Sequence, residues 1–147
     1  MSSKVSHLLF AANRWECVDT IKGALSQGTC VILDRYFMSG SAYTIALEKG
    51  TYSPSYLDPD RELPLPDLTF CLLPQLPNPR NDYGLEVLEK SHHQEAVSST
   101  YVSLVDVIPN SEIINSTQCK DVLHRLILVK VKNTLDENSM SDVQYFK

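Results

Sequence analysis

An acidic and a basic residue, Asp34 and Arg35, directly follow the apolar run 31–33. An apolar, β-branched run of this kind predicts a buried parallel strand over 29–33. Charged residues at the carboxyl end of such a strand lie at the edge where open α/β sheets bind ligands. The arginine suits a phosphate group, and the aspartate suits Mg²⁺ or its water shell. The alternative is that both charges pair with neighbouring helices and only hold the fold together.

An aromatic and a basic residue, Phe10 and Arg14, are four residues apart in a predicted helix, so they share one helix face. Together they can grip a nucleotide, because the ring can stack on a base and the guanidinium can hydrogen-bond or pair with a charge. The alternative is that Phe10 belongs to the core and Arg14 to the solvated surface.

Two further segments carry groups that can bind phosphate. Ser39 and Gly40 open a predicted helix, whose first backbone N–H groups favour anions, and the glycine permits close approach of a ligand. Arg80 lies in a proline-rich loop, where a positioned cation can stabilise a transferring phosphoryl group. The alternatives are an ordinary capping serine and an exposed loop arginine. His92 and His93 are adjacent in a helix and point in different directions, so no metal site is predicted there.

The elements that position these residues alternate along the chain. Helices are predicted over 2–27, 39–48, 86–107 and 116–131, and strands over 29–33, 68–73 and 112–115. Alternation of this kind predicts a parallel α/β sheet with right-handed crossovers. One domain is predicted over 1–132, followed by a polar C-terminal tail over 133–147 that we expect to fray.

Composition excludes several classes of function. The net charge of −5 argues against a broad surface for nucleic acid, and no apolar run approaches the ~20 residues that span a membrane. The four cysteines lack the close pairing of a zinc site, and we expect reduced, buried thiols. The first residues lack the apolar region of a signal peptide, which favours a cytoplasmic or nuclear location.

Four ordered segments resemble the eukaryotic branch of the thymidylate kinase family. Residues 8–16 (LLFAANRWE) are similar to its LLFSANRWE segment, and residues 34–43 match its DRYxxSGxAY segment. Residues 59–67 match PDxGLxxPD, with Glu62 in place of the glycine, and residues 84–95 fall on the GxERYE lid and the QE stretch that follows. The resemblance implies an α/β fold, the three-layer, P-loop NTPase-like parallel sheet of nucleoside monophosphate kinases.

The resemblance also implies a reaction, in which the γ-phosphoryl group of Mg-ATP is transferred to dTMP to give dTDP. On the dTMP side it implies that Phe10 stacks on thymine, Arg14 reads the base, Arg35 holds the phosphate, and the nucleoside pocket is lined by Ser39, Gly40, Tyr43 and Gln94. On the transfer side it implies that Asp34 helps to order the phosphate and Mg²⁺, that Arg80 is the lid arginine, and that adenine is contacted near Ser116, Thr117 and Gln118. Tyr43 can also crowd the 2′ position of the sugar. In this family the helix matching 3–27 packs in a homodimer.

The chain also departs from the family pattern. Residues 1–147 hold no Gly-x₄-Gly-Lys-Ser/Thr phosphate loop, and Val87 and Leu88 replace the Arg-Tyr pair of the lid. Because phosphoryl transfer depends on positioning and charge stabilisation, we expect these residues alone to lack most of the rate. The family's phosphate-loop strand is central in its sheet, so we expect that 31–35 does not pair with 68–73 and that the chain alone is unstable or prone to aggregate.

Two other functions remain open at this point. The first is a non-catalytic fragment that binds dTMP or only dimerises. The second is another nucleoside monophosphate or deoxynucleoside kinase, since an Asp-Arg pair at a strand end also occurs there. The segment 13–16 (NRWE) argues against the second.

Overall fold

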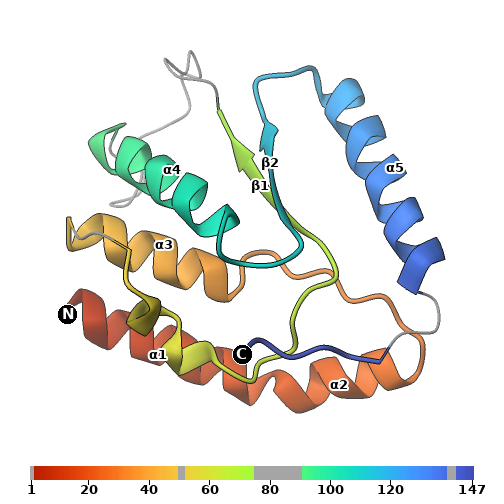
Figure 1. Cartoon of the computed structure of the whole chain (residues 1–147), viewed down its shortest axis with the longest axis horizontal. Coiled ribbons are helices and arrows are strands. Elements are labelled where there is room, and N and C mark those ends of the chain that lie inside the picture. Colours follow the sequence, from red (N-terminus) through yellow and green to blue (C-terminus); the bar gives the residue numbers. More distant parts are fainter. Residues whose placement is uncertain (1, 50–51, 75–90, 139–141) are drawn as a thin grey trace.

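The fold is a small parallel sheet with helices on both sides, seen in a computed structural model that describes residues 2–49, 52–74, 91–138 and 142–147. In chain order the elements are α1 (Ser3–Glu16), α2 (Val18–Ser26), α3 (Phe37–Leu47), the 3₁₀ turns η1 (Pro54–Tyr56) and η2 (Asp58–Asp60), β1 (Thr69–Leu73), α4 (Ser91–Val105), β2 (Ser111–Asn115) and α5 (Lys120–Asn138). Helices α1, α3 and α4 lie on one side of the sheet and α5 lies on the other (Figure 1).

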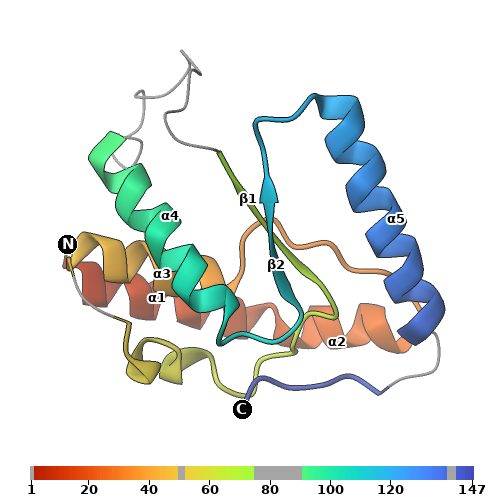
Figure 2. The same cartoon turned by 45° about the horizontal axis from the view of Figure 1, so that its top comes forward.

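The strands β1 and β2 pair in parallel, from Thr69 opposite Ser111 to Leu73 opposite Asn115. Parallel neighbours need a long crossover, and helix α4 lies in that connection (Figure 2). The two strands predicted from the apolar runs 68–73 and 112–115 are therefore confirmed, with their parallel direction.

The predicted buried strand over 29–33 is wrong for this chain. Residues 29–33 form neither helix nor strand, and the side chains of Ile32 and Leu33 are 91% and 41% exposed. A strand needs a hydrogen-bonded neighbour, and the ladder that the described residues form joins β1 to β2. The apolar run has β-propensity but no partner in that ladder, which agrees with the expectation that it does not pair with 68–73.

The predicted helix over 2–27 is two helices that meet at Cys17. The Ser2 side chain caps α1 by accepting a hydrogen bond from Val5 N at 3.4 Å, as Ser/Thr caps do. At the other end, Gly28 follows α2 with φ +72°, the left-handed stop that the sequence predicts. Helix α3 begins at Phe37, so Ser39 lies inside its first turn and is not the capping residue.

The C-terminal residues are packed and not frayed. Helix α5 begins at Lys120 and continues to Asn138, beyond the predicted end near 131. Residues 142–147 then return to the core, where Phe146 N donates to Leu63 O at 2.9 Å and the Phe146 ring stacks on Phe37 with centroids 4.8 Å apart. A composition argument missed this because one buried aromatic is enough to anchor a polar tail. The domain boundary at 132 stays a prediction.

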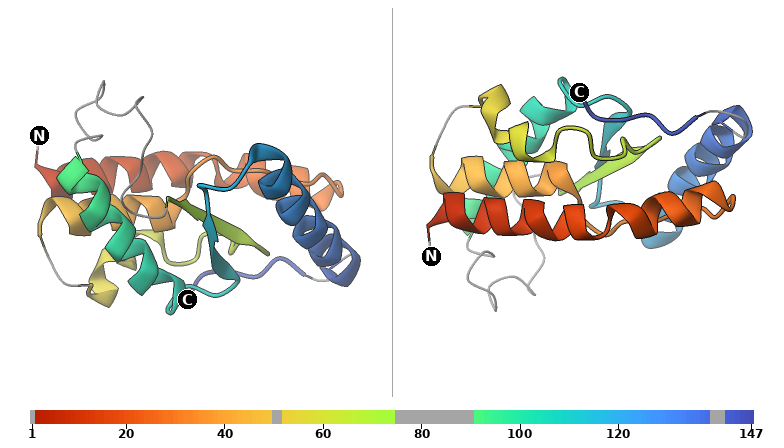
Figure 3. Two further views of the ribbon diagram at one scale, coloured as in Figure 1. Left: turned by 90° about the horizontal axis from the view of Figure 1, so that it is seen from above. Right: turned by 90° about the horizontal axis from the view of Figure 1, so that it is seen from below.

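The core is centred on α3, which is apolar on nearly all sides and therefore needs cover all round. It contacts α1 on one side and α4 on the other (Figure 3). The core side chains are Val18, Phe37, Met38, Ala42, Leu57, Leu63, Cys71, Leu104, Ile108 and Phe146. No helix in the described part of the chain is long and apolar enough to cross a membrane. The buried helix α3 thus carries the predicted ligand residues Ser39, Gly40 and Tyr43.

Candidate nucleotide site

Arg14 is held by a buried aspartate. Its Nε and Nη2 atoms donate to the two carboxylate oxygens of Asp60, each at 2.7 Å. The side chain of Arg14 is 11% exposed and that of Asp60 is fully buried. Bidentate pairs of this kind fix the guanidinium in orientation as well as in position. The alternative of a solvated Arg14 is therefore wrong.

Gly40 lets the Arg14 guanidinium lie against helix α3. A Cβ atom at this position would lie 3.1 Å from both Nη1 and Nη2 of Arg14, closer than side chains normally pack. The prediction was that Gly40 permits close approach of a ligand, and in this structure the group that approaches is Arg14. The role of Gly40 in a nucleoside pocket stays a prediction.

Tyr36 lies beside the Arg14–Asp60 pair. Its hydroxyl is buried and has no hydrogen-bond partner in the described part of the chain. Burial raises the pKa of Tyr36 to about 12, and the negative charge of Asp60 acts in the same direction. The turn η2, which contains Asp60, is hydrogen-bonded to α1 through Trp15, whose Nε1 donates to Pro59 O at 2.9 Å.

Arg35 is exposed and has a left-handed backbone, with φ +66°. Its guanidinium carbon lies 5.5 Å from the centre of the Tyr43 ring, within the range of a cation–π contact. A non-glycine residue in this conformation is uncommon, and such outliers gather at functional sites. Asp34 is also exposed, so both charges of the predicted pair are open to a ligand.

Helix α4 closes the other side of this region. The hydroxyl of Tyr101 donates to Ser39 Oγ at 2.8 Å, and burial raises the pKa of Tyr101. Gln94 lies two turns earlier on the same helix and is half-buried. Seven residues separate the two positions, so they share a helix face.

The remaining predicted site residues are spread more widely. Phe10 is 62% exposed, one turn before Arg14, so it is not a core residue and its ring is free to stack. The predicted adenine contacts Ser116, Thr117 and Gln118 follow the carboxyl end of β2, where Thr117 N donates to Asn115 Oδ1 at 2.9 Å. Arg80 and the lid positions 87–88 lie outside the described residues.

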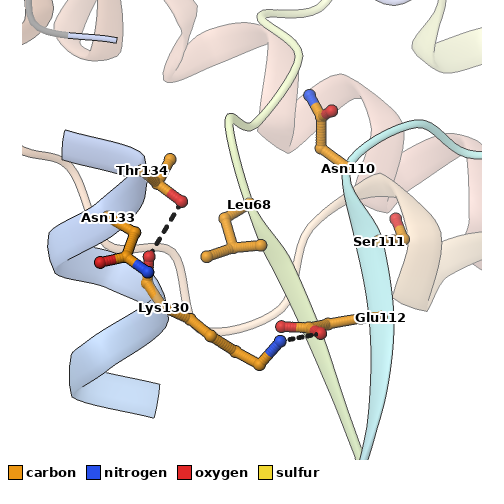
Figure 4. Close-up of a pocket in the computed structure, with 7 residues that line it drawn as sticks. All are labelled: Leu68, Asn110, Ser111, Glu112, Lys130, Asn133 and Thr134. Atoms are coloured by element: carbon orange, nitrogen blue, oxygen red, sulfur yellow. Dashed lines mark hydrogen bonds and ion pairs between the residues drawn. The ribbon is translucent and has the colours of Figure 1, made fainter. Parts of the chain in front are cut away.

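A cavity of about 330 Å³ lies elsewhere, between the sheet and α5 (Figure 4). Its lining residues are Leu68, Asn110, Ser111, Glu112, Lys130, Asn133 and Thr134. Lys130 Nζ and Glu112 Oε2 form an ion pair across it at 2.6 Å. The cavity is at the amino ends of β1 and β2, whereas open α/β sheets bind ligands at the carboxyl ends. We therefore place the candidate site around the start of α3.

Comparison with known proteins identifies the family of this chain. The sequence profile described as "Thymidylate kinase" matches residues 1–127. The chain belongs to the thymidylate kinase family. It is 42% identical to the thymidylate kinase of Plasmodium falciparum (isolate 3D7) over 69% of the chain and 49% of that relative. With the thymidylate kinase of Homo sapiens it shares 38% identity over 84% of the chain and 59% of the relative.

A solved thymidylate kinase structure, from Candida albicans, shares the fold. It superposes with a TM-score of 0.81 and 28% identity, over the whole of this chain and 74% of that one. The predicted nucleoside monophosphate kinase fold is thereby confirmed. The chain spans about half to three fifths of the curated thymidylate kinases it matches, with 49% and 62% of the first two covered.

Sequence reasoning did not assign roles to three residues that the structure brings to this candidate site. Asp60 and Tyr36 lie within the family segments, and Tyr101 follows Gln94 at helical spacing. A buried aspartate looks like a solvated one until its partner is known. The available signal for Asp60 was its place between prolines in a segment that resembles the family's.

Proposed function

We propose that this chain provides the dTMP-binding part of a thymidylate kinase, an enzyme that transfers the γ-phosphoryl group of Mg-ATP to dTMP to give dTDP. The observation that carries the proposal is the arrangement around the start of α3. Arg14 is fixed against Gly40, and Arg35 stands over Tyr43 less than one turn further along the helix. The fixed guanidinium of Arg14 suits a base, and the exposed guanidinium of Arg35 suits a phosphate.

The chemistry of each group follows from its surroundings. Phe10 is exposed and offers a face on which a pyrimidine can stack. Arg14 is fixed and suits a base carbonyl, because a guanidinium has only donors. Arg35 is exposed and suits the dTMP phosphate, while Tyr43 beside it suits the sugar and can disfavour a 2′-hydroxyl.

The phosphoryl-donor side rests on fewer groups. No three His, Cys, Asp or Glu side chains gather into a metal site in the described residues. We therefore propose that Mg²⁺ arrives with ATP and that the exposed Asp34 carboxylate is the residue of this chain that contacts it or its water. Ser116, Thr117 and Gln118 are proposed to contact adenine, and Arg80 to contact the phosphates. A cytoplasmic or nuclear location is part of the same proposal.

Calorimetric titration of the chain with dTMP and with thymidine tests the phosphate role of Arg35. We expect Arg35→Ala to weaken dTMP binding at least about tenfold, a loss of 1.4 kcal/mol, and to leave thymidine binding nearly unchanged. Arg61→Ala is the matched control, because Arg61 is an exposed arginine whose ion pair with Asp58 lies on the surface. Equal dTMP affinity in wild type and Arg35→Ala contradicts the assignment.

A coupled assay of ADP release from dTMP and ATP separates an enzyme from a non-catalytic binding module. We expect dTMP binding with little turnover, since residues 1–147 contain no phosphate-loop motif. Turnover at an ordinary kinase rate contradicts the view that such a loop is essential. Absence of any heat with dTMP, from a chain shown to be folded, contradicts the binding proposal itself.

The outer face of α1 is the proposed dimer surface. Val5, Leu8 and Leu9 are 47%, 57% and 56% exposed, and with Ala12 they form one apolar stripe opposite the buried His7 and Ala11. We expect Leu8→Glu to shift the chain to monomer in sedimentation velocity. Val129→Glu is the control, because Val129 on α5 is also 57% exposed. A dimer that survives Leu8→Glu contradicts the proposed surface.

A further inference from the structure

The hydrogen bonds of Arg14 leave only one edge of its guanidinium free. A guanidinium has five N–H donors, of which Asp60 takes the Nε donor and one Nη2 donor. A Cβ atom added at Gly40 would lie 3.1 Å from both Nη1 and Nη2, so the missing side chain of Gly40 leaves room for these two nitrogens beside helix α3. Three donors are therefore not used by Asp60: two on Nη1 and the second on Nη2.

We propose that Asp60 is a positioning residue that sets which base this site accepts. Asp60 holds the guanidinium so that the Nη1 edge presents donors, and no acceptor, to the bound base. The inference rests on the proposed function, in which Arg14 reads the base. It adds that the selectivity depends on the buried carboxylate of η2 and not on Arg14 alone.

The surroundings of Asp60 make it suitable for this role. Its side chain is fully buried, and its backbone carbonyl accepts from Leu63 N at 3.2 Å. The preceding Pro59 carbonyl is held by Trp15 of α1, the residue next to Arg14. The carboxylate and the arginine are therefore anchored to the same helix from both sides. A guanidinium with this support cannot turn to adapt to a different base edge.

The expected selectivity follows from donor and acceptor chemistry. Thymine offers a carbonyl oxygen at ring position 4, whereas cytosine offers an amino group there. Facing the fixed donors of Arg14, the carbonyl is paired, while the amino group leaves donors unpaired on a side chain that is only 11% exposed. We therefore expect the chain to bind dTMP at least about tenfold more tightly than dCMP, since leaving a buried donor unpaired is costly.

The experiment measures the dissociation constants of dTMP and dCMP by calorimetry in wild type and variants. We expect Asp60→Asn to reduce the dTMP-to-dCMP preference at least about fivefold while dCMP affinity stays within about threefold, because the phosphate contact is kept. A purely structural role for Asp60 predicts that both affinities fall together with the preference unchanged, and that result overturns the proposal.

A second variant avoids the loss of a buried charge, which can unfold the protein. Gly40→Ala places a Cβ atom 3.1 Å from Nη1 and Nη2, so the guanidinium must shift although both charges remain. We expect the same loss of preference for dTMP. Gly23→Ala is the matched control, because nothing lies within 4 Å of the Cβ atom added there. An unchanged preference in Gly40→Ala also overturns the proposal.

The failure of this inference differs from the failure of the proposed function. Wild type that binds neither dTMP nor dCMP contradicts both. Wild type that binds dTMP and dCMP equally contradicts the positioning role and leaves dTMP binding intact. Wild type that prefers dTMP, with the preference kept in Asp60→Asn and Gly40→Ala, contradicts the positioning role alone.

Discussion

Two residues with left-handed backbones, Arg35 and Glu62, differ in what their side chains contact. Arg35 has φ +66° and stands over Tyr43 in the candidate site. Glu62 has φ +68° and is exposed, in the segment where the family's pattern has glycine. The backbone at Arg35 places its guanidinium over the Tyr43 ring, whereas the described residues show no such contact of the Glu62 side chain.

Glu62→Gly is therefore expected to stabilise the protein by about 0.5–1 kcal/mol, because glycine adopts positive φ without a steric penalty and this exceeds its entropic cost. The backbone N–H of Glu62, which donates to Phe146 O at 2.6 Å, is kept in the variant. Urea unfolding measures the change. Glu62→Ala is the control, since it removes the carboxylate but keeps the Cβ atom, and it should give no such gain. Equal stabilisation by alanine contradicts the backbone explanation.

Tyr36 gives an expected dependence of stability on alkaline pH. Its pKa is raised from 10 to about 12, so the folded state holds the phenolic proton more tightly than the unfolded state. The stabilisation is complete below pH 10 and is lost as the pH rises from 10 to 12. Tyr36→Phe removes this dependence on alkaline pH. Because it also removes a buried hydroxyl without a hydrogen-bond partner in the described residues, it should raise the free energy of unfolding at pH 7 by about 1 kcal/mol.

Urea unfolding of wild type and Tyr36→Phe at pH 7, 10 and 11 tests this expectation. Tyr101→Phe is the control, since the Tyr101 hydroxyl has a partner in Ser39 and its loss should destabilise at pH 7. If Tyr36→Phe loses as much stability above pH 10 as wild type does, Tyr36 is not a source of the alkaline loss.

At the scale of elements, the strand predicted over 29–33 is absent from the structure, whereas the helix predicted over 39–48 is present as α3. Both are apolar, but α3 is covered by α1 and α4, and 29–33 lacks a strand neighbour in the described ladder. A helix satisfies its backbone internally, whereas a strand depends on another segment. The helix predicted over 39–48 is therefore present in the structure, whereas the buried strand predicted over 29–33 is not.

Ile32→Lys is expected to change the free energy of unfolding of this chain by less than about 0.5 kcal/mol, as for other exposed positions. The side chain of Ile32 is 91% exposed, so the charge stays in water. Ile45→Lys is the comparison, because Ile45 on α3 is 2% exposed and a lysine there should unfold the chain. Circular dichroism measures the unfolding of both variants. If Ile32→Lys also unfolds the chain, the segment 29–33 is not exposed, and the predicted buried strand is favoured.

At the scale of the whole molecule, a described sheet of two strands carries helices on both sides. Parallel sheets are normally buried on both faces, yet Leu72 of β1 and Ile113 of β2 are 47% and 42% exposed. Natural domains have a net stability of only ~5–15 kcal/mol, and we expect residues 1–147 to lie at or below the lower end of that range. At such low stability, the contacts of residues 142–147 with the core make up a large part of the net free energy of unfolding.

Phe146→Ala is expected to cost about 3 kcal/mol, the low end for a buried aromatic, and to remove most of the net stability. Phe146 is 8% exposed and stacks on Phe37, which is itself 1% exposed. Urea unfolding and light scattering measure the loss of stability and the onset of aggregation. Val143→Ala, at a position 38% exposed, is the control and should be nearly neutral. A neutral Phe146→Ala shows that the C-terminal residues do not support the core.

The sequence by itself determined the family and the parallel direction of β1 and β2. These depend on local pattern, on segments that resemble the family's, and on the chirality of the crossover. Tertiary structure alone decided that Asp60 holds Arg14, that Gly40 receives the guanidinium, that 29–33 is exposed and that Phe146 joins the core. Each of these needs two segments distant in sequence, and a local pattern does not say which partner a buried charge, an apolar run or a single aromatic will find.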